Sequence, residues 1–190
     1  MTGQGRAKRV GAVAGALALA GVLTGVGTGC TPFMEAIGEA PPSAEPVPCP
    51  EGGVRLLEGT GNAAMGLRVG EVQLLNCGTR PYLLAGHPDL RLLDREERPV
   101  EVSVGQGSNG VVSSTGLDSA PQPVTLRPGE SASVSLLWRN LVTDGTPAEG
   151  WVVDLAPKPG APRLRLRLTV PVDLGTTGKL GVGPWRPAGR

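Results

Sequence analysis

A glycine pattern is the first feature of the sequence that could carry chemistry. Gly105, Gly107 and Gly110 form a G-x-G-x-x-G motif directly after an alternating apolar segment, as in dinucleotide-binding loops. In those loops the third glycine sits in a helix whose N-terminal N–H groups face the pyrophosphate. Here Pro121 and Pro123 follow, and prolines at these positions exclude a crossover helix. We therefore predict a long turn between strands and no nucleotide site.

A second glycine-rich stretch, DLGTTGKLG at residues 173–181, resembles the phosphate loop of heat-shock-70 and actin-type ATPases. A phosphate loop that ends in Gly-Lys needs a glycine five residues before that pair and a Ser or Thr after it. Asp173 and Leu180 stand at those positions, so a turn is predicted. The 18 basic and 17 acidic residues leave a net charge of +1, which gives no field that would attract nucleic acid.

Histidine, metal and hydrolytic chemistry have few candidates. The single histidine, His87, lies between Gly86 and Pro88, which indicates a loop, and no second histidine stands at ligand spacing. Neither a G-x-S-x-G elbow nor an S-x-x-K motif occurs, so we expect no metal, no cofactor and no enzyme. The alternative is a hydrolase acting on cell-wall or extracellular polymer, whose carboxylates would meet only in the fold. Its candidates are Asp89, Asp94, Asp118 and Glu130.

The N-terminal segment predicts export. Three basic residues precede an uncharged apolar run at 10–26, which is the organisation of a secretory signal. Small residues at 27–29 then precede Cys30, as they precede the lipidated cysteine of bacterial lipoproteins. We predict that residues 1–29 are a signal peptide and that lipid on Cys30 holds the protein at the membrane. Gly27 stands where that pattern prefers an aliphatic residue, so secretion without lipid is the alternative.

Residues 30–48 contain five prolines and little to bury, which predicts a Pro-rich flexible tether. The remaining residues, 49–190, are predicted to form one domain. Cys49 and Cys77 are the two cysteines left after Cys30. Because disulfides persist outside the cytosol, we predict a bridge between them. The alternative is two free thiols.

The body of the chain alternates apolar and polar residues with a period of two. In RLRLRLTV, residues 163–170, three leucines and Val170 lie opposite the arginines and Thr169, which is the pattern of a half-buried strand. Pro128 and Gly129 supply a type II turn before a similar strand at 131–138. The expected strands are 54–57, 66–76, 82–84, 90–94, 100–104, 124–126, 131–138, 151–155 and 163–170. Short strands separated by Gly and Pro predict an all-β, immunoglobulin-like antiparallel β-sandwich, without long helices.

Two surface features could bind a partner. The row of Arg163, Arg165 and Arg167 could dock an anionic envelope polymer or lipid headgroups. The alternative is a solvated strand face whose charges discourage edge-to-edge pairing. Trp185, in GPWRP near the end of the chain, is predicted to be exposed, whereas the other two tryptophans follow strand patterns and are predicted to lie in the core.

Three strings carry a resemblance to a known family: NCGTRPYLLAGHPDLRLLD at 76–94, VTLRPGESASVSLLWRN at 124–140 and DLGTTGKLGVGPWRP at 173–187. With them, residues 49–187 resemble the exported lipoproteins of high-G+C bacteria that carry domain of unknown function 4232. The resemblance implies a β-sandwich outside the cytoplasm on a lipid anchor, and it brings no activity with it. The family pattern usually has an aromatic residue where His87 stands, so no special role is expected for that histidine.

Together these features predict a lipid-anchored β-sandwich at the outer face of the cytoplasmic membrane. We expect it to serve the cell envelope as a binding or structural module, with an envelope polymer or protein as partner. A secreted, soluble binding protein is the alternative in location, and the hydrolase is the alternative in function. The sequence does not indicate an oligomeric state.

Overall fold

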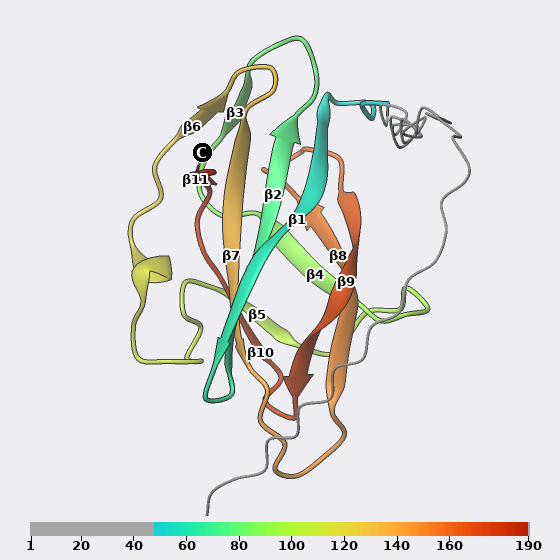
Figure 1. The fold of residues 1–190 in the computed structure, drawn as a ribbon, viewed down its shortest axis with the longest axis vertical. Helices are drawn as coiled ribbons and strands as arrows, with labels where there is room; N and C mark the ends of the chain where they lie inside the picture. The colour runs from blue at the N-terminus through green and yellow to red at the C-terminus, as the bar shows by residue number, and fades with distance from the viewer. Residues whose placement is uncertain (1–47, 190) are drawn as a thin grey trace, which may run out of the picture. The chain divides into compact units, whose positions relative to one another are not determined.

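The structure, a computed structural model, describes residues 48–189, and their regular elements are almost all strands (Figure 1). The predicted signal peptide, Cys30 and the tether up to residue 47 lie outside the described residues. The strands are β1 (Val54–Ala64), β2 (Leu67–Asn76), β3 (Tyr82–Leu84), β4 (Asp89–Leu93), β5 (Ser103–Gln106), β6 (Val124–Leu126), β7 (Ser131–Arg139), β8 (Ala148–Ala156), β9 (Leu164–Gly175), β10 (Lys179–Val182) and β11 (Arg186–Pro187). The 3-10 turn η1 (Gly116–Asp118) is the one helical element in this part of the chain, which therefore holds no apolar helix long enough to cross a membrane.

The strands form two facing layers. One sheet has the order β1-β2-β7-β10-β5, with β11 also paired to β7, and the other has the order β4-β8-β9. A short pair of β3 and β6 lies at one end (Figure 1). Side chains from both sheets build one hydrophobic core. The predicted all-β sandwich is confirmed.

One strand pair departs from the antiparallel prediction. Strands β10 and β5 are parallel, with Lys179 opposite Ser103, because the long connection between them lets the chain return in the same direction. Strand β10 also lies inside the stretch predicted to be a turn. Gly175 and Gly178 do have the positive φ of turn residues, at 53° and 58°, but the chain extends again from Lys179. The turn prediction was correct for residues 176–178, between β9 and β10, and wrong for the strand residues on either side of them.

The period of two predicts most of the burial correctly. In β7 the inward side chains of Ala132, Val134, Leu136 and Trp138 are all buried. In β9, Leu168 is buried and the arginines on either side of Leu166 are exposed. Val170 was predicted to join the leucines, yet it is 71% exposed. The pairing of β8 with β9 shifts register between Gly150 and Val152, and this irregularity interrupts the alternation around Val170.

The segment 100–104 was predicted to be a strand, but β5 begins only at Ser103. The N–H of Val100 donates instead to the carbonyl of Leu92 at 2.9 Å, so this part of the segment lies along β4. Val102 still packs against the core, as the alternation predicts.

The turn before β7 is confirmed. The N–H of Glu130 donates to the carbonyl of Arg127 at 3.0 Å, which closes a four-residue turn. Gly129 has a φ of 84°, the positive value that a type II turn requires at its third position. Pro128 in the second position presets the other half of the turn.

Candidate functional site

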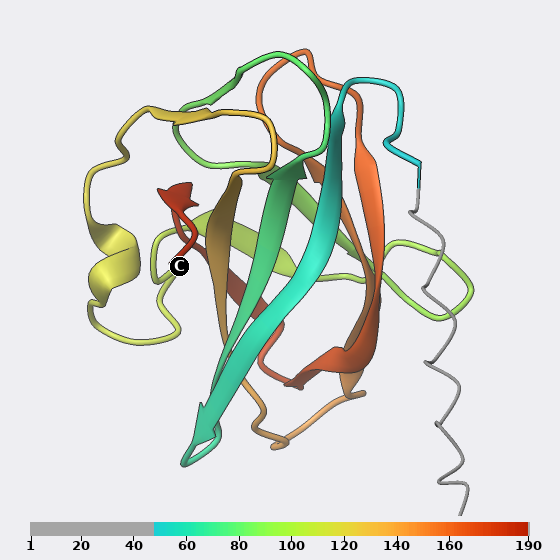
Figure 2. The same ribbon diagram turned by 45° about the horizontal axis from the view of Figure 1, so that its top comes forward.

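A cleft of about 630 Å³ opens between the two sheets, and its size lies in the range of small-molecule sites. Its walls come from the second half of β1, the first half of β2, the end of β7 and the middle of β9. The hairpin that joins β1 and β2 lies apart from the end of β9 in both views (Figures 1 and 2). We call the end of the sandwich at this hairpin, which holds the cleft, the open end. The closed end is the opposite one, where β2 finishes at Asn76.

Small inward-facing residues on β1 and β2 make room for the cleft. Toward the closed end the inward positions hold the paired Leu56 and Leu74, which are both buried. Toward the hairpin they hold the paired Gly61 and Gly70, followed by Ala63. A register shift within β1 separates the two halves, and such an irregularity bends a strand. The sheet therefore has little side-chain volume to pack against β9 at the open end.

Trp138 forms much of the cleft floor. The residue is 8% exposed and lines the cleft together with Leu136. A Cβ on Gly70 would lie 3.2 Å from two carbons of its ring, so the glycine provides the space that the indole occupies. The indole Nε1 is buried and has no acceptor among the described residues. Leaving a buried N–H without an acceptor costs roughly 1–3 kcal/mol of stability. A ligand that offered an acceptor to this atom would remove that cost.

Glu58 and Arg68, both charged and both lining the cleft, differ in their partners. The carboxylate of Glu58 accepts from the backbone N–H of Thr169 at 2.9 Å and from its hydroxyl at 3.0 Å, which links β1 to β9. Arg68 is half-buried and lies directly opposite Trp138 in the β2–β7 register. Within residues 48–189, the side chain of Arg68 has no hydrogen bond or ion pair. Of these two cleft side chains, the carboxylate is therefore satisfied and the guanidinium is available.

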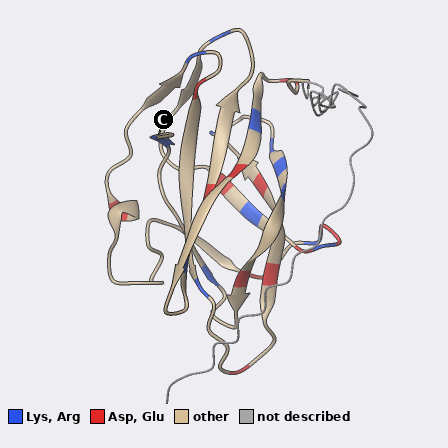
Figure 3. Ribbon diagram, in the orientation of Figure 1, with Lys and Arg blue, Asp and Glu red and all other residues tan. Residues whose placement is uncertain are grey.

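Of the predicted arginine row, Arg163 directly precedes β9, and Arg165 and Arg167 are exposed on it. Acidic and basic residues are interspersed in this part of the fold (Figure 3). Each arginine has a carboxylate partner. Arg163 contacts Asp154 at 3.0 Å and Asp89 at 2.8 Å. The other two arginines share Glu97, at 2.6 Å from Arg165 and 3.5 Å from Arg167. Ion pairs of this kind, in which each positive charge has a negative neighbour, are typical of a solvated strand face.

Trp185 corrects the prediction of exposure. It is 1% exposed, its indole Nε1 donates to the carbonyl of Pro157 at 2.9 Å, and its backbone N–H donates to the carbonyl of Gly86 at 3.0 Å. The residue therefore fastens the C-terminal segment to two loops at the closed end. Trp151, predicted to be core, is instead half-buried, and the guanidinium of Arg95 lies 3.7 Å from its ring centroid.

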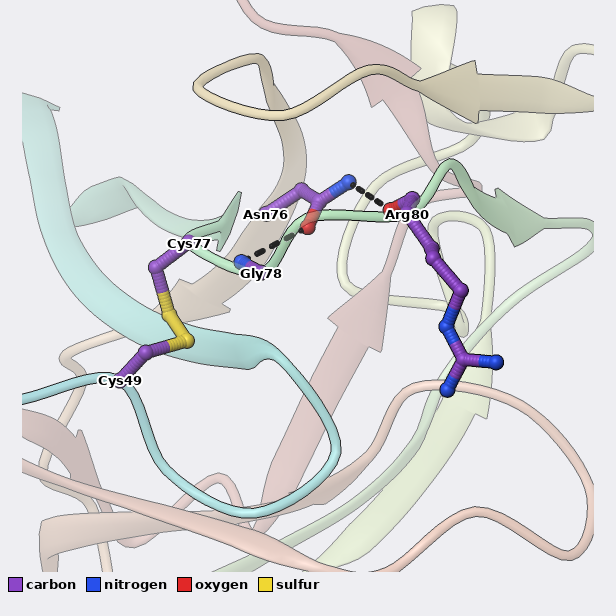
Figure 4. Close-up of a disulfide and its surroundings, with 5 residues drawn as sticks. All are labelled: Cys49, Asn76, Cys77, Gly78 and Arg80. Atoms are coloured by element: carbon purple, nitrogen blue, oxygen red, sulfur yellow. Dashed lines mark hydrogen bonds between the residues drawn. A yellow bond between two sulfur atoms is a disulfide. The ribbon is translucent and has the colours of Figure 1, made fainter.

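The closed end carries the predicted disulfide. Cys49 and Cys77 are bonded, with their Cα atoms 5.6 Å apart (Figure 4), so that prediction is confirmed. Sequence reasoning overlooked the neighbouring Asn76, which is 1% exposed. Its amide donates to the carbonyls of Arg80 at 2.8 Å and Leu126 at 2.9 Å, and its side-chain oxygen accepts from the N–H of the second residue after it. The signal in the sequence that could have indicated this residue is its place as the first residue of the family string at 76–94.

The four carboxylates of the hydrolase alternative are each held by their local structure. Asp118 accepts from the N–H groups of Ser108 at 2.8 Å and Thr115 at 2.7 Å, and hydrogen bonds from Ser108 lower its pKa to about 2. Asp94 accepts a hydrogen bond from the side chain of Arg98, and Asp89 accepts one from the side chain of Arg163. Glu130 accepts from the backbone N–H of Arg127. No group of three His, Cys, Asp or Glu residues in the described chain could hold a metal ion. Partial burial lowers the pKa of His87.

The G-x-G-x-x-G segment begins inside β5 at Gly105, and the predicted turn starts only at Gly107. Gly107 and Gly110 have φ values of 66° and 69°, as predicted for a turn. The side chain of Asn109 donates to the carbonyls of Ser103 at 2.8 Å and Leu180 at 3.0 Å. The backbone N–H groups that would face a phosphate in a nucleotide loop are engaged within the chain, that of Gly107 with the Val182 carbonyl at 2.8 Å and that of Ser108 with Asp118 at 2.8 Å.

Fold and cleft together define a single-domain β-sandwich with an open groove between its sheets. The chain belongs to the family described as domain of unknown function (DUF4232), whose model matches residues 49–186. No curated protein and no solved structure matches it. The family strings hold residues of both ends: Asn76 and Cys77 open the first, Trp138 of the cleft lies in the second, and Trp185 lies in the last.

Proposed function

We propose that this protein is an exported binding module of the cell envelope, held by lipid on Cys30 at the outer face of the cytoplasmic membrane, and that it is not an enzyme. The observation that carries the proposal is the cleft at the open end. A concave, largely apolar surface with a few polar groups is the usual form of a ligand site.

The disulfide supports export. A bridge of this kind persists in oxidising compartments outside the cytosol, and the bonded pair is the one that remains after Cys30 is assigned to lipid. Cys49 is also the first residue after the predicted tether. A force applied at the anchor would be transmitted through the disulfide from Cys49 to Cys77, next to the end of β2. It would therefore not act first on the hydrogen bonds that hold β1 in the sheet.

The carboxylate contacts support a non-catalytic role. A catalytic acid and base must lie within reach of one reacting group. Asp118 is engaged in the glycine loop, Asp94 and Asp89 are paired with arginines, and Glu130 closes the turn before β7. Each of these four side chains already has a structural task in a different part of the fold.

Intact mass and cell fractionation test the anchor. We expect membrane-extracted protein to begin at Cys30, carry acyl mass and retain one disulfide, while a Cys30→Ser variant passes into the medium. A Ser43→Ala variant in the tether is the control and should behave as the wild type. Release of the wild type and Cys30→Ser at the same unlipidated mass would replace the anchored protein by the secreted alternative.

Retention on isolated envelope fractions tests the binding role. The purified protein should be held specifically by a wall, lipid or protein fraction, and excess unlabelled protein should displace it. Failure to bind any of the three fractions would contradict a binding module, whatever the mass measurement shows.

A further inference from the structure

We infer that the cleft binds a single-chain anionic amphiphile, a long-chain carboxylate, with its apolar chain on the Trp138 floor and its head group at Arg68. The inference deepens the proposed binding function and rests on it, but it does not depend on the lipid anchor.

The apolar part of the ligand follows from the floor and walls. Buried side chains of both sheets reach the cleft, namely Val72, Leu136, Trp138, Leu168 and Val172. Val170 stands at its side and is 71% exposed, and covering such apolar surface stabilises a complex by about 25 cal/mol per Å² removed from water. The opposite wall, at Gly61 and Ala63, contributes almost no side-chain volume, so the space stays open along the strand.

The charge of the head group follows from the three charged residues in the cleft lining, two glutamates and one arginine. Glu58 already accepts two hydrogen bonds from Thr169, and the carboxylate of Glu71 accepts from the amide of Gln73 at 3.0 Å. Arg68 has no partner in the described chain. A guanidinium that is free in a partly apolar site is best matched by a carboxylate, which can accept two parallel hydrogen bonds.

The unpartnered indole N–H supplies a second reason to place an acceptor here. Trp138 lies opposite Arg68 across the β2–β7 pair, so a head group at the arginine lies next to the indole. An acceptor that reached this buried Nε1 would satisfy a donor that has none in the described structure, which would also favour the bound state. One anionic group beside a long apolar surface defines a single-chain amphiphile.

Calorimetry with four probes tests the assignment: dodecanoate, dodecanol, acetate and phosphatidylglycerol vesicles. The chain is produced with Cys30→Ser, so that no lipid is attached and no detergent is needed. We expect dodecanoate to bind at least about tenfold more tightly than dodecanol, because a hydrogen-bonded ion pair is worth roughly that factor. Acetate, which lacks the apolar chain, should not bind measurably.

Three variants locate the site. Arg68→Gln should weaken dodecanoate at least about tenfold and leave dodecanol unchanged. Ala63→Phe, which fills the cleft from β1, should abolish binding of both. Arg91→Gln is the matched control, since Arg91 is an exposed arginine on the outer face of β4, and it should change neither. Thermal unfolding of each variant confirms that the domain is folded.

The contrary outcomes are distinct. Equal affinity for dodecanol and dodecanoate would overturn the anionic head group, and unchanged binding in Ala63→Phe would overturn the cleft. Vesicle binding that depends on Arg68 but not on Ala63 would assign the arginine to a membrane surface. If dodecanoate does not bind while an envelope fraction retains the protein, the ligand class is wrong and the proposed function stands. If neither binds, both fail.

Discussion

The two ends of the β1–β2 pair differ in how their inward side chains are used. At the closed end, Leu56 and Leu74 are buried between the sheets, and Asn76 satisfies the backbone of two neighbouring segments. At the open end, the same strands present Gly61 and Ala63, and Trp138 lies beneath them with an unpaired donor. The buried amide of the closed end is satisfied within the chain, whereas the buried indole N–H of the open end has no acceptor among the described residues.

The difference indicates that the closed end serves stability and that the open end serves ligand binding. The closed end combines a covalent bridge, a buried asparagine and a buried tryptophan. Substitutions there should change the free energy of unfolding and leave ligand binding intact wherever the domain still folds. Substitutions at the open end should do the reverse.

The largest effect is expected from Trp185→Ala. Removing a fully buried tryptophan costs roughly 3–5 kcal/mol, and the Pro157 carbonyl would lose its donor. Urea unfolding measures the change. Trp185→Phe keeps most of the volume and removes only the hydrogen bond, so it should cost about 1 kcal/mol. A loss below 1 kcal/mol in the alanine variant would mean that the closed end does not depend on this residue.

Removing the bridge with the double change Cys49→Ser and Cys77→Ser should cost roughly 3–4 kcal/mol in the loop-entropy model, since the two cysteines have a sequence separation of 28. Reducing the wild type should produce the same loss, and reductant should not affect the double variant. If the double variant unfolded at the same urea concentration as the oxidised wild type, the bridge would have no part in stabilising this end.

A smaller, pH-dependent effect is expected at Asp118. Its folded pKa is lowered to about 2 by hydrogen bonds from Ser108 and Thr115, so its ionised form stabilises the fold above the unfolded pKa near 4. That contribution is lost as the pH falls from about 4 to 2.

Urea unfolding of the wild type and of Asp118→Asn at several pH values measures this contribution. The urea midpoint of the variant should lie below that of the wild type at pH 5–7, and the gap should narrow toward pH 2. Asp144→Asn, at an exposed carboxylate between β7 and β8, is the control and should show no such narrowing. A gap independent of pH would remove the charged hydrogen bonds from the explanation.

Most of the fold could be predicted because its signals are local. The period of two locates β7 and β9, the cysteine count gives the bridge, and Pro128 with Gly129 gives the turn before β7. The exceptions are short or irregular. Strand β10 follows directly after turn glycines, and the irregularity around Val170 arises from pairing with β8, which no local pattern records.

The site could not be predicted in the same way, because its parts meet only in the fold. The cleft combines four strands, and Gly61 and Gly70 read in the sequence as ordinary weak points of a strand. Trp185 was predicted to be exposed because GPWRP has no periodicity, yet its burial comes from Pro157 and Gly86, both far away in the chain. Arg68 could not be distinguished from the other arginines until the fold placed it, half-buried, in the lining of the cleft.

The smallest expected effect on stability is that of Ala63→Phe, and it is the sharpest test of the comparison. Ala63 is exposed on the inward side of β1 and its backbone is extended, so an aromatic residue fits the strand without strain. The free energy of unfolding should change by no more than about 0.5 kcal/mol, in contrast to Trp185→Ala. A loss of several kcal/mol would mean that the cleft closes in solution and that the open end is packed like the other. A neutral change combined with lost dodecanoate binding would show that this end is spared from packing so that a ligand can occupy it.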